Sequence, residues 1–516
     1  MSALPTCPAV PVEFEMSPRL TLLRDEPPRS FDLKGRAAYF VGIGGCGMSG
    51  LARLFRTRGA MVAGSDREAT DTTELLLGER IPVEFNQQSG RLPDHCDMVV
   101  ISAAIKPDHP QVLEANRRGV KVLYYAEALG KCMQGFSGVS IAGTHGKSTT
   151  TAMLGVALAD AGLDPSVIVG ATSRQLGRGA KACTPEDPSI GFRLGSAQIA
   201  AGARKGAPGV LVAEACEFNR SFHSHRPLIG SISSVEADHL DCYPSIEAIV
   251  ESFQTFAKLI PSDGKLFIAY KGAHRREVTA GVDCAIETIG FDPSSDWVVG
   301  FETADRTVTV TRRGEIVASW RNTVFGSHNA MNAAMALAIG MELGADPSIL
   351  ADSLGRFRGV DRRMQRLGDR TMPDGRAVRV YDDYGHHPTE IEVSLKALRD
   401  AESPQARGGR LICVFQPHQH SRTRHLMEEF AGSFSQADVV IVPDIYFVRD
   451  SEEERLKVTA SDLVNRLTEK GVKALHISGF DAIVSHLRQT CRGDDLLLVM
   501  GAGPVWQVGR DFLGQP

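Results

Sequence analysis

The chain has 516 residues, too many for one ordinary hydrophobic core, so about two to four domains are expected. Charged residues make up 23% of the chain and the formal net charge is −5, which argues against non-specific binding to nucleic acid or to an anionic membrane. No stretch approaches about 20 apolar residues, and residues 1–30 lack the apolar segment of a signal peptide, so we expect neither membrane insertion nor secretion. The 10 scattered cysteines form no C-x-x-C pair, which is typical of a reduced, cytoplasmic protein.

Residues 1–35 are expected to be a flexible leader, and a βαβ pattern follows them. A short apolar strand at 37–41 precedes a glycine-rich turn, a helix over 51–58 and a strand at 61–64. Gly42, Gly44 and Gly47 fit the G-x-G-x-x-G spacing, and Asp66 lies about 20 residues further on, an arrangement that binds nucleotide diphosphates. Asp66 either binds a ribose hydroxyl or caps the strand end. Strands and helices alternate to about residue 134, which predicts a Rossmann-like domain.

The sequence G-V-S-I-A-G-T-H-G-K-S-T-T-T at 138–151 predicts a strand, a glycine loop and the start of a helix. Gly143 and Gly146 let backbone N–H groups converge on a phosphate, where Lys147 adds a point charge and Ser148 can hold Mg²⁺. The general phosphate-loop pattern requires a glycine at position 141, where this chain has isoleucine. A glycine-rich turn with a surface lysine is therefore the alternative.

Two further strands are predicted to end beside this loop. The strand at 209–214 ends in Glu214, and the strand at 229–235 runs into His239, so these side chains can hold Mg²⁺. Alternatively, Glu214 caps a helix and His239 packs in a loop. An alanine-rich helix through residue 343 opens with His328, Asn329 and Asn332, which either reach a ligand or cap the helix.

The last third again alternates strands with helices, which predicts a mostly parallel sheet. Residues 359–365 are interpreted as a domain joint, and the strands are expected at 378–381, 411–415, 439–442, 474–477 and 495–500. Four histidines follow two of these strands, but their spacing lacks the companion ligands of a zinc site, so zinc is not expected.

Six motifs, in order between about residues 36 and 503, together resemble the Mur ligases. They are G-I-G-G-C-G-M-S-G, G-T-H-G-K-S-T-T-T, E-A-D-H-L-D, F-G-S-H-N-A-M-N, D-D-Y-G-H-H-P-T-E and F-Q-P-H-x-x-S-R-T. The phosphate loop of that family is the short G-T-x-G-K-[ST] form, which accounts for Ile141. The resemblance implies an α/β fold of three domains: a Rossmann-like UDP-substrate-binding domain (36–134), a central P-loop ATPase domain (135–358) and a Rossmann-like C-terminal domain that closes over the amino-acid site (359–516).

The motifs are most similar to the branch of the family that joins L-alanine to UDP-N-acetylmuramate in peptidoglycan precursor synthesis. The resemblance implies that ATP and Mg²⁺ convert the lactyl carboxylate to an acyl phosphate, which the amine of L-alanine attacks. No nucleic-acid or membrane partner is expected. A Mur ligase with another acceptor, such as the murein-tripeptide recycling ligase, stays open as an alternative. So do a nicotinamide-dependent oxidoreductase, which rests on the first glycine motif alone, and a nucleotide-binding regulatory protein with a decayed site.

The resemblance also implies roles for individual residues. The residues implied around ATP are Gly143, Thr144, His145, Gly146, Lys147, Ser148, Thr149, His328, Asn329, Asn332, Arg363 and Asp383. Those implied around the UDP-linked substrate are Gly42, Gly44, Gly45, Gly47, Met48, Ser65, Asp66 and Ser102. The magnesium ligands are Ser148, Glu214 and His239, and the amino-acid and carboxylate site comprises Asp383, Tyr384, His386 and Arg422. The catalytic residues are Lys147, His239, Arg363, His386 and Arg422.

The chain departs from the family pattern at four places. Cys216 and Asn219 replace two aspartates that usually follow the metal-binding glutamate. Gln419 stands where a second arginine is usual, and Tyr125 stands where an arginine precedes Ala-Glu. The segment between residues 170 and 214 is longer than usual. Cys216 and Asn219 lie near the expected metal site, and Gln419 lies where the substrate carboxylate is expected to bind.

Overall fold

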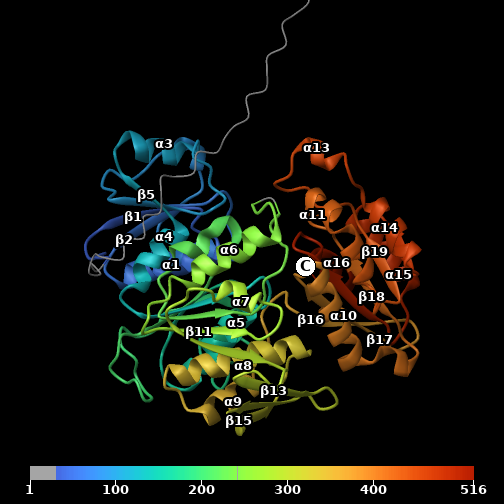
Figure 1. The fold of residues 1–516 in the computed structure, drawn as a ribbon. Coiled ribbons are helices and arrows are strands. Elements are labelled where there is room, and N and C mark those ends of the chain that lie inside the picture. The colour runs from blue at the N-terminus through green and yellow to red at the C-terminus, as the bar shows by residue number, and fades with distance from the viewer. Residues whose placement is uncertain (1–30, 241, 516) are drawn as a thin grey trace, which may run out of the picture.

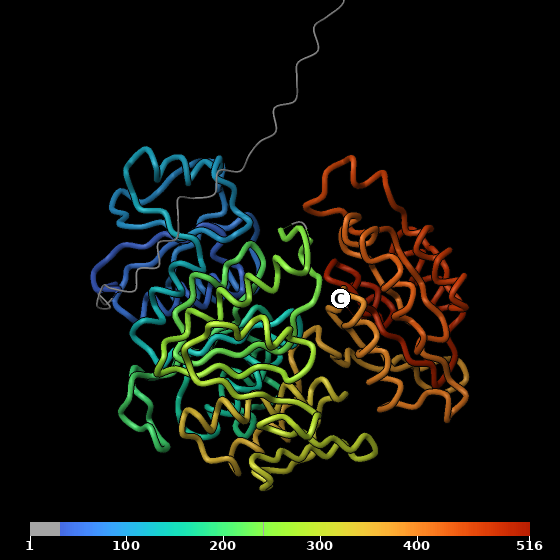
Figure 2. Tube along the Cα trace, viewed as in Figure 1, coloured from blue at the N-terminus to red at the C-terminus, as the bar shows by residue number. Residues whose placement is uncertain are grey.

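The computed structural model describes residues 31–240 and 242–515. The chain forms three α/β units, each built on its own sheet from one continuous stretch of sequence, as the colours of Figure 1 and Figure 2 show. This confirms the predicted fold class. Within the described ranges, no helix has the length and apolar character that crossing a bilayer requires.

The first unit is a five-stranded parallel sheet in the order β3-β2-β1-β4-β5. Its strands are β1 (Ala37–Val41), β2 (Met61–Ser65), β3 (Val83–Glu84), β4 (Met98–Ile101) and β5 (Lys121–Tyr124). Its helices are α1 (Cys46–Thr57), α2 (Asp71–Gly78), α3 (Pro110–Arg117) and α4 (Tyr125–Met133). All residues of β1 are buried, as expected for a central parallel strand with both faces covered. Helix α1 starts inside the glycine turn, five residues earlier than predicted.

The end of the expected leader is packed rather than flexible. Leu33 is 1% exposed, and the ring of Phe31 lies edge-on to Phe55 of α1 at 5.7 Å between centroids. Apolar contact with α1 explains this difference, because burying two large side chains offsets the loss of chain entropy. The rest of the predicted leader, residues 1–30, lies outside the described residues.

The central unit is a ten-stranded sheet in the order β15-β14-β13-β12-β11-β10-β6-β9-β7-β8. Its strands are β6 (Ser137–Ala142), β7 (Ser166–Ser173), β8 (Ile190–Arg193), β9 (Val210–Glu214), β10 (Ile229–Ile232), β11 (Lys265–Ala269), β12 (Ala285–Gly290), β13 (Trp297–Glu302), β14 (Thr307–Arg312) and β15 (Glu315–Arg321). Its α-helices are α5 (Lys147–Asp160), α6 (Ile246–Ala257), α7 (Arg275–Val278), α8 (Ser327–Glu342) and α9 (Pro347–Gly355). Parallel pairing brings the ends of β6, β9 and β10 to one edge. Strand β10 ends three residues earlier than predicted, so a loop carries the chain onward from Ser233.

The C-terminal unit is a six-stranded sheet in the order β16-β17-β21-β18-β19-β20, parallel except for the antiparallel β16. Its strands are β16 (Gln365–Thr371), β17 (Ala377–Asp383), β18 (Leu411–Phe415), β19 (Val439–Val442), β20 (Ala474–His476) and β21 (Leu496–Met500). Its helices are α10 (Pro388–Glu402), α11 (His420–His425), α12 (Met427–Gly432), α13 (Glu452–Arg455), α14 (Ala460–Glu469), α15 (Phe480–Thr490) and α16 (Trp506–Leu513). Strand β16 was not predicted, because its charged and polar residues do not alternate with apolar ones.

The first two units share a hydrophobic core. Ile168 and Leu211 of the central sheet pack in one cluster with Leu51 and Phe55 of α1. The guanidinium of Arg53 also lies 3.9 Å from the ring centroid of Phe192 on β8. The predicted boundary at residue 134 therefore separates two sheets but not two cores, and these units are held as one body by apolar burial.

Candidate active site

The phosphate loop connects β6 to α5 and adopts a backbone that needs glycine at two positions. Gly143 has φ +129°, and a Cβ there would lie 2.8 Å from the backbone nitrogen of Ser233 and closer still to its hydroxyl. Gly146 has φ +81°, and a Cβ there would lie 2.5 Å from Oδ1 of Asn332 on α8. The first N–H groups of α5 have no partner within the helix. A conformation of this kind suits binding of an anion at the helix N-terminus.

Lys147, the first residue of α5, is held back against its own loop. Its Nζ donates to the carbonyl oxygens of Gly143 (2.7 Å) and Thr144 (2.9 Å) and lies 2.9 Å from Oε2 of Glu217. Burial lowers the pKa of Lys147, but the nearby acidic groups, with Glu217 foremost, together outweigh burial and raise the pKa above its ordinary value. Glu217, which is 3% exposed, is therefore the counter-ion of the loop lysine. The sequence contained Glu217 next to the expected metal segment but nothing that predicted this contact.

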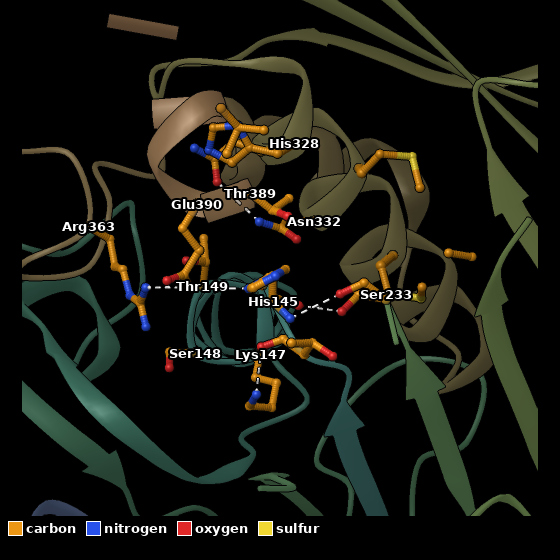
Figure 3. A pocket seen from close by; sticks show the side chains of 18 of the residues that line it. His145, Lys147, Ser148, Thr149, Ser233, His328, Asn332, Arg363, Thr389 and Glu390 are labelled. Atoms are coloured by element: carbon orange, nitrogen blue, oxygen red, sulfur yellow. Dashed lines mark hydrogen bonds and ion pairs between the residues drawn. The ribbon is translucent and has the colours of Figure 1, made fainter. Parts of the chain in front are cut away.

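The loop forms one wall of a cavity of about 590 Å³. Residues of the C-terminal unit, including Arg363, Asp383 and Glu390, complete the cavity, and Figure 3 shows Arg363 and Glu390 approaching the loop. All residues implied around ATP line this cavity except Gly143, whose role is to shape the loop. The residues predicted to bind ATP belong to two units and lie up to 240 positions apart in the sequence. The fold brings them to one cavity.

The polar residues at the start of α8 are not capping groups. The N-cap of α8 is Gly326, which makes no side-chain cap. Instead, Nδ2 of Asn329 donates to the carbonyl of Phe325 (2.7 Å) and Nδ2 of Asn332 donates to Oδ1 of Asn329 (3.2 Å). Burial lowers the pKa of His328 to about 4, so its imidazole is neutral at pH 7. These three residues present neutral polar groups to the cavity.

The three implied magnesium ligands line two different cavities. Ser148 and Glu214 line the large cavity, where oxygen ligands of this kind fit Mg²⁺ held jointly with substrate phosphates. His239 instead lines a separate small cavity with Asp238, Gln419 and Arg422. The early end of β10 explains this, because the following loop turns toward the C-terminal unit and leaves His239 at φ +52°. The Nδ1 atom of His239 is buried and has no hydrogen-bond partner among the described residues.

The implied amino-acid and carboxylate residues lie on the C-terminal unit where it meets the central unit. Asp383 accepts hydrogen bonds from the backbone N–H groups of Met364 (2.9 Å) and Gly385 (2.6 Å). Burial lowers the pKa of His386 to about 4. The Nη2 atom of Arg422 lies 2.6 Å from Oδ1 of Asp238, so this arginine forms a buried ion pair across the interface.

A second set of contacts between the same two units surrounds His145, whose ring lies between Glu236 and Glu390. Its Nε2 is 3.4 Å from Oε2 of Glu236, and its Nδ1 is 3.3 Å from Oε1 of Glu390. Burial lowers the pKa of His145, but hydrogen bonding to these two carboxylates outweighs burial and raises it to about 9. Thr389 also donates to Oε2 of Glu236 (2.5 Å). Glu236 and Glu390 occur in two of the motifs listed above. Those motifs alone did not indicate that both carboxylates face His145.

The glycine turn of the first unit packs closely on neighbouring side chains. Oδ2 of Asp66 accepts a hydrogen bond from the backbone N–H of Gly44 (2.7 Å), and a Cβ on Gly42 would lie 3.3 Å from Oγ of Ser102. Gly42 also has φ +82°, and a Cβ on Gly44 would lie 2.9 Å from Oδ2 of Asp66, so both positions require glycine. Gly45 is the N-cap of α1, and a Cβ on Gly47 would lie 2.7 Å from the hydroxyl of Tyr125.

Two residues implied around the UDP-linked substrate face the interior of the first unit. Ser65 is fully buried and donates to Oε1 of Gln111 (2.7 Å), and Met48 is 4% exposed in the hydrophobic core. Ser65 is the last residue of β2, and its carbonyl accepts hydrogen bonds from the backbone N–H groups of Gly42 (2.8 Å) and Ile43 (3.0 Å), so it supports the turn. Met48 lies in the first turn of α1 and packs into the core.

The departures from the family pattern have different surroundings. Cys216 is exposed, whereas Gln419 is 3% exposed and has φ +72°. The Nε2 atom of Gln419 is buried without a hydrogen-bond partner among the described residues. Tyr125 lies against Gly47.

Comparison with known protein families gives three matches in chain order. Residues 37–137 match the "Mur ligase family, catalytic domain", residues 141–340 the "Mur ligase middle domain", and residues 362–503 the "Mur ligase, glutamate ligase domain". The three matched ranges follow the three sheets.

Curated relatives match nearly the whole chain. The UDP-N-acetylmuramate–L-alanine ligase of Caldanaerobacter subterraneus subsp. tengcongensis is 34% identical over 485 residues, covering 93% of this chain and 98% of the relative. The enzyme of the same name from Clostridium novyi is 35% identical over 482 residues, covering 93% and 97%.

Solved structures share the fold. The UDP-N-acetylmuramate–alanine ligase of Thermotoga maritima superposes with a TM-score of 0.71 at 23% identity, covering 93% of this chain and 98% of the other. A murein peptide ligase of Psychrobacter arcticus gives a TM-score of 0.67 at 24% identity, with the same coverage. The ordered domain matches and the full-length relatives above 30% identity lead to one conclusion, which also confirms the resemblance of the motifs: the chain belongs to the Mur ligase family.

Proposed function

We propose that this chain uses ATP to join L-alanine to the lactyl carboxylate of UDP-N-acetylmuramate in peptidoglycan precursor synthesis. The observation that carries the proposal is the similarity, at 34% over 93% of the chain, to relatives that bear this activity in their names. The cavity between the phosphate loop and the C-terminal unit supports it, because Arg363 and Asp383 there face the loop of a different unit.

The loop residues act on the phosphates of ATP. The N–H groups at the start of α5 bind phosphate oxygens, and Lys147 supplies positive charge beside them once a phosphate competes with Glu217. Ser148 and Glu214 would hold Mg²⁺, which neutralises phosphate charge when bound. Arg363 adds a second positive charge from the C-terminal unit, so phosphoryl transfer requires both units in contact.

The C-terminal unit positions the nucleophile. His386 is neutral at pH 7 because burial lowers its pKa to about 4, so it can accept a hydrogen bond from the amine of L-alanine and orient it. Arg422 and Tyr384 are proposed to bind the carboxylates there. The carboxylate of Asp383 accepts hydrogen bonds from two backbone N–H groups, and we propose that it stabilises the backbone between the ATP and amino-acid sites.

The remaining assignments follow from the same reaction. Gly42, Gly44, Gly45, Gly47, Asp66 and Ser102 are proposed to form the turn that binds the UDP-linked substrate. His239 remains a proposed metal ligand only if the loop after β10 moves on substrate binding. We also propose a cytoplasmic location, because the proposed substrates are ATP and a nucleotide sugar.

Phosphate release from ATP and Mg²⁺ tests the proposal, measured with UDP-N-acetylmuramate in the presence and absence of L-alanine. We expect release to require both substrates and the nucleotide sugar to gain the mass of one alanine residue. Lys147→Ala is the inactive control. Release with a peptide but not with L-alanine would reassign the chain to a different acceptor, and no release with any acceptor would refute the ligase activity.

A further inference from the structure

Three side chains from three separate segments converge at the interface between the central and C-terminal units. His145 lies in the phosphate loop, Glu236 lies in the loop after β10, and His387 is the N-cap of α10. One ligand atom from each lies within 4.8 Å of the others. Oε2 of Glu236 is 3.4 Å from Nε2 of His145 and 3.9 Å from Nδ1 of His387.

The far side of each imidazole ring has its own acceptor. Nδ1 of His145 faces the carboxylate of Glu390 at 3.3 Å, and Nε2 of His387 faces the carbonyl oxygen of Ala237 at 3.2 Å. Once His145 has lost its extra proton and an N–H is donated to each of these acceptors, the other nitrogen of each ring carries a lone pair on the side of Glu236. Metal-binding histidines typically have this arrangement, in which a carboxylate or backbone carbonyl orients the ring from behind.

The surroundings also favour a cation. Glu236 and Glu390 place two carboxylates around His145, and Arg363, at 3.5 Å from Glu390, is the one guanidinium paired with this set in the described part of the chain. A bound divalent ion would replace the proton that His145 shares with the carboxylates. It would also displace the hydrogen bond from the backbone N–H of Thr389 to Nδ1 of His387, which at 3.3 Å is long and therefore weak.

We propose that His145, Glu236 and His387 form a binding site for a divalent transition-metal ion, with Zn²⁺ as the preferred ion. Two imidazoles and one carboxylate are a known zinc ligand set that leaves a fourth position open, whereas Mg²⁺ prefers oxygen ligands. Zinc was not expected from the sequence, because His387 and its neighbours lack companion ligands nearby along the chain. The central unit supplies those companions from positions about 150 and 240 residues away.

Such an ion would connect the two units. Its ligands come from the phosphate loop, the loop after β10 and the start of α10, so binding would hold the C-terminal unit against the ATP cavity, which His145 and Glu236 line. The site is distinct from the proposed magnesium site, since neither Ser148 nor Glu214 belongs to it.

The experiment uses the full-length protein, freed of metal by chelation and without nucleotide. Co²⁺ is added and visible absorption is recorded, because a Co²⁺ ion bound by a small number of ligands that include imidazole absorbs visible light strongly. Zn²⁺ is then added as a competitor. We expect one Co²⁺ per chain, displaced by one Zn²⁺ and not by excess Mg²⁺. His387→Gln and Glu236→Gln should each weaken binding by at least about 100-fold, and Glu390→Gln, which removes only the orienting carboxylate, by about 10-fold to 100-fold.

His425→Gln is the matched control, because His425 is exposed on α11, away from the cluster, and should bind as the parent does. Circular dichroism checks that each variant is folded. Absence of the cobalt spectrum in the parent, or unchanged binding in both His387→Gln and Glu236→Gln, would overturn the proposal. Because the measurement needs neither ATP nor a UDP-sugar, its outcome is independent of the proposed ligase activity.

Discussion

The buried ion pair between Lys147 and Glu217 makes a measurable prediction about the phosphate loop. Glu217→Gln keeps the size of the side chain and one oxygen acceptor but removes the negative charge. Breaking a buried ion pair from one side costs about 3–5 kcal/mol. Because Lys147 retains its bonds to the carbonyls of Gly143 and Thr144, we expect the lower end, about 3 kcal/mol. For a unit of about 200 residues this lowers Tm by about 6–12 °C.

The assay is thermal unfolding of the parent, Glu217→Gln and the control Glu251→Gln, each with and without ATP and Mg²⁺. Glu251 is exposed on α6, so its variant should melt as the parent does. Bound phosphates give Lys147 a new counter-charge, so ATP should raise Tm by more in Glu217→Gln than in the parent. Equal Tm values without nucleotide, or equal increments with it, would refute the assigned role of Glu217.

The same pair predicts how Lys147 variants behave. Lys147→Met should abolish ATP turnover and also leave Glu217 buried without a counter-ion, which lowers Tm. The double variant Lys147→Met/Glu217→Gln should regain much of the Tm while staying inactive, since no charge is then buried alone. A double variant as unstable as the sum of both single variants would show that the two residues are not coupled.

Three further predictions concern other buried positions. Gly143→Ala places a Cβ against Ser233 and should abolish ATP binding measured by calorimetry, whereas Gly78→Ala, at a helical position on α2 with open space around it, should not. Asp238→Asn breaks the buried pair with Arg422 and should loosen the contact between units, seen as an increased radius of gyration in solution scattering; an unchanged radius would contradict this. Burial outweighs the ion pair with Arg362 (3.2 Å) and raises the pKa of Asp382 to about 6, so the folded state binds a proton more tightly than the unfolded state and stability falls as pH rises from about 4 to about 6. Asp382→Asn should therefore unfold in urea with up to about 3 kcal/mol more stability at pH 7 and with no gain at pH 3, and a loss at pH 7 would contradict the argument.

Local signals in the sequence were sufficient for the fold class, the family and most strands. Apolar runs such as 411–415, bounded by turn residues, mark buried parallel strands because both faces of the sheet are covered. The turns at Gly42 and Gly143 could be predicted for a similar reason, since only glycine tolerates their backbone conformation or the close approach of a neighbour. These features depend on a few consecutive residues, so they can be read without knowing what packs around them.

The tertiary structure alone decided which charged groups face each other. Glu217 pairs with Lys147 over 70 positions, Asp238 with Arg422 over 184, and His145 meets Glu390 from another unit. No local pattern encodes such pairs, because folding alone brings the two charges close enough for their attraction to offset the cost of desolvating them. The placement of His239 in a different cavity from Ser148 and Glu214 also depends on tertiary structure, because it follows from where β10 ends and how the next loop packs against the C-terminal unit.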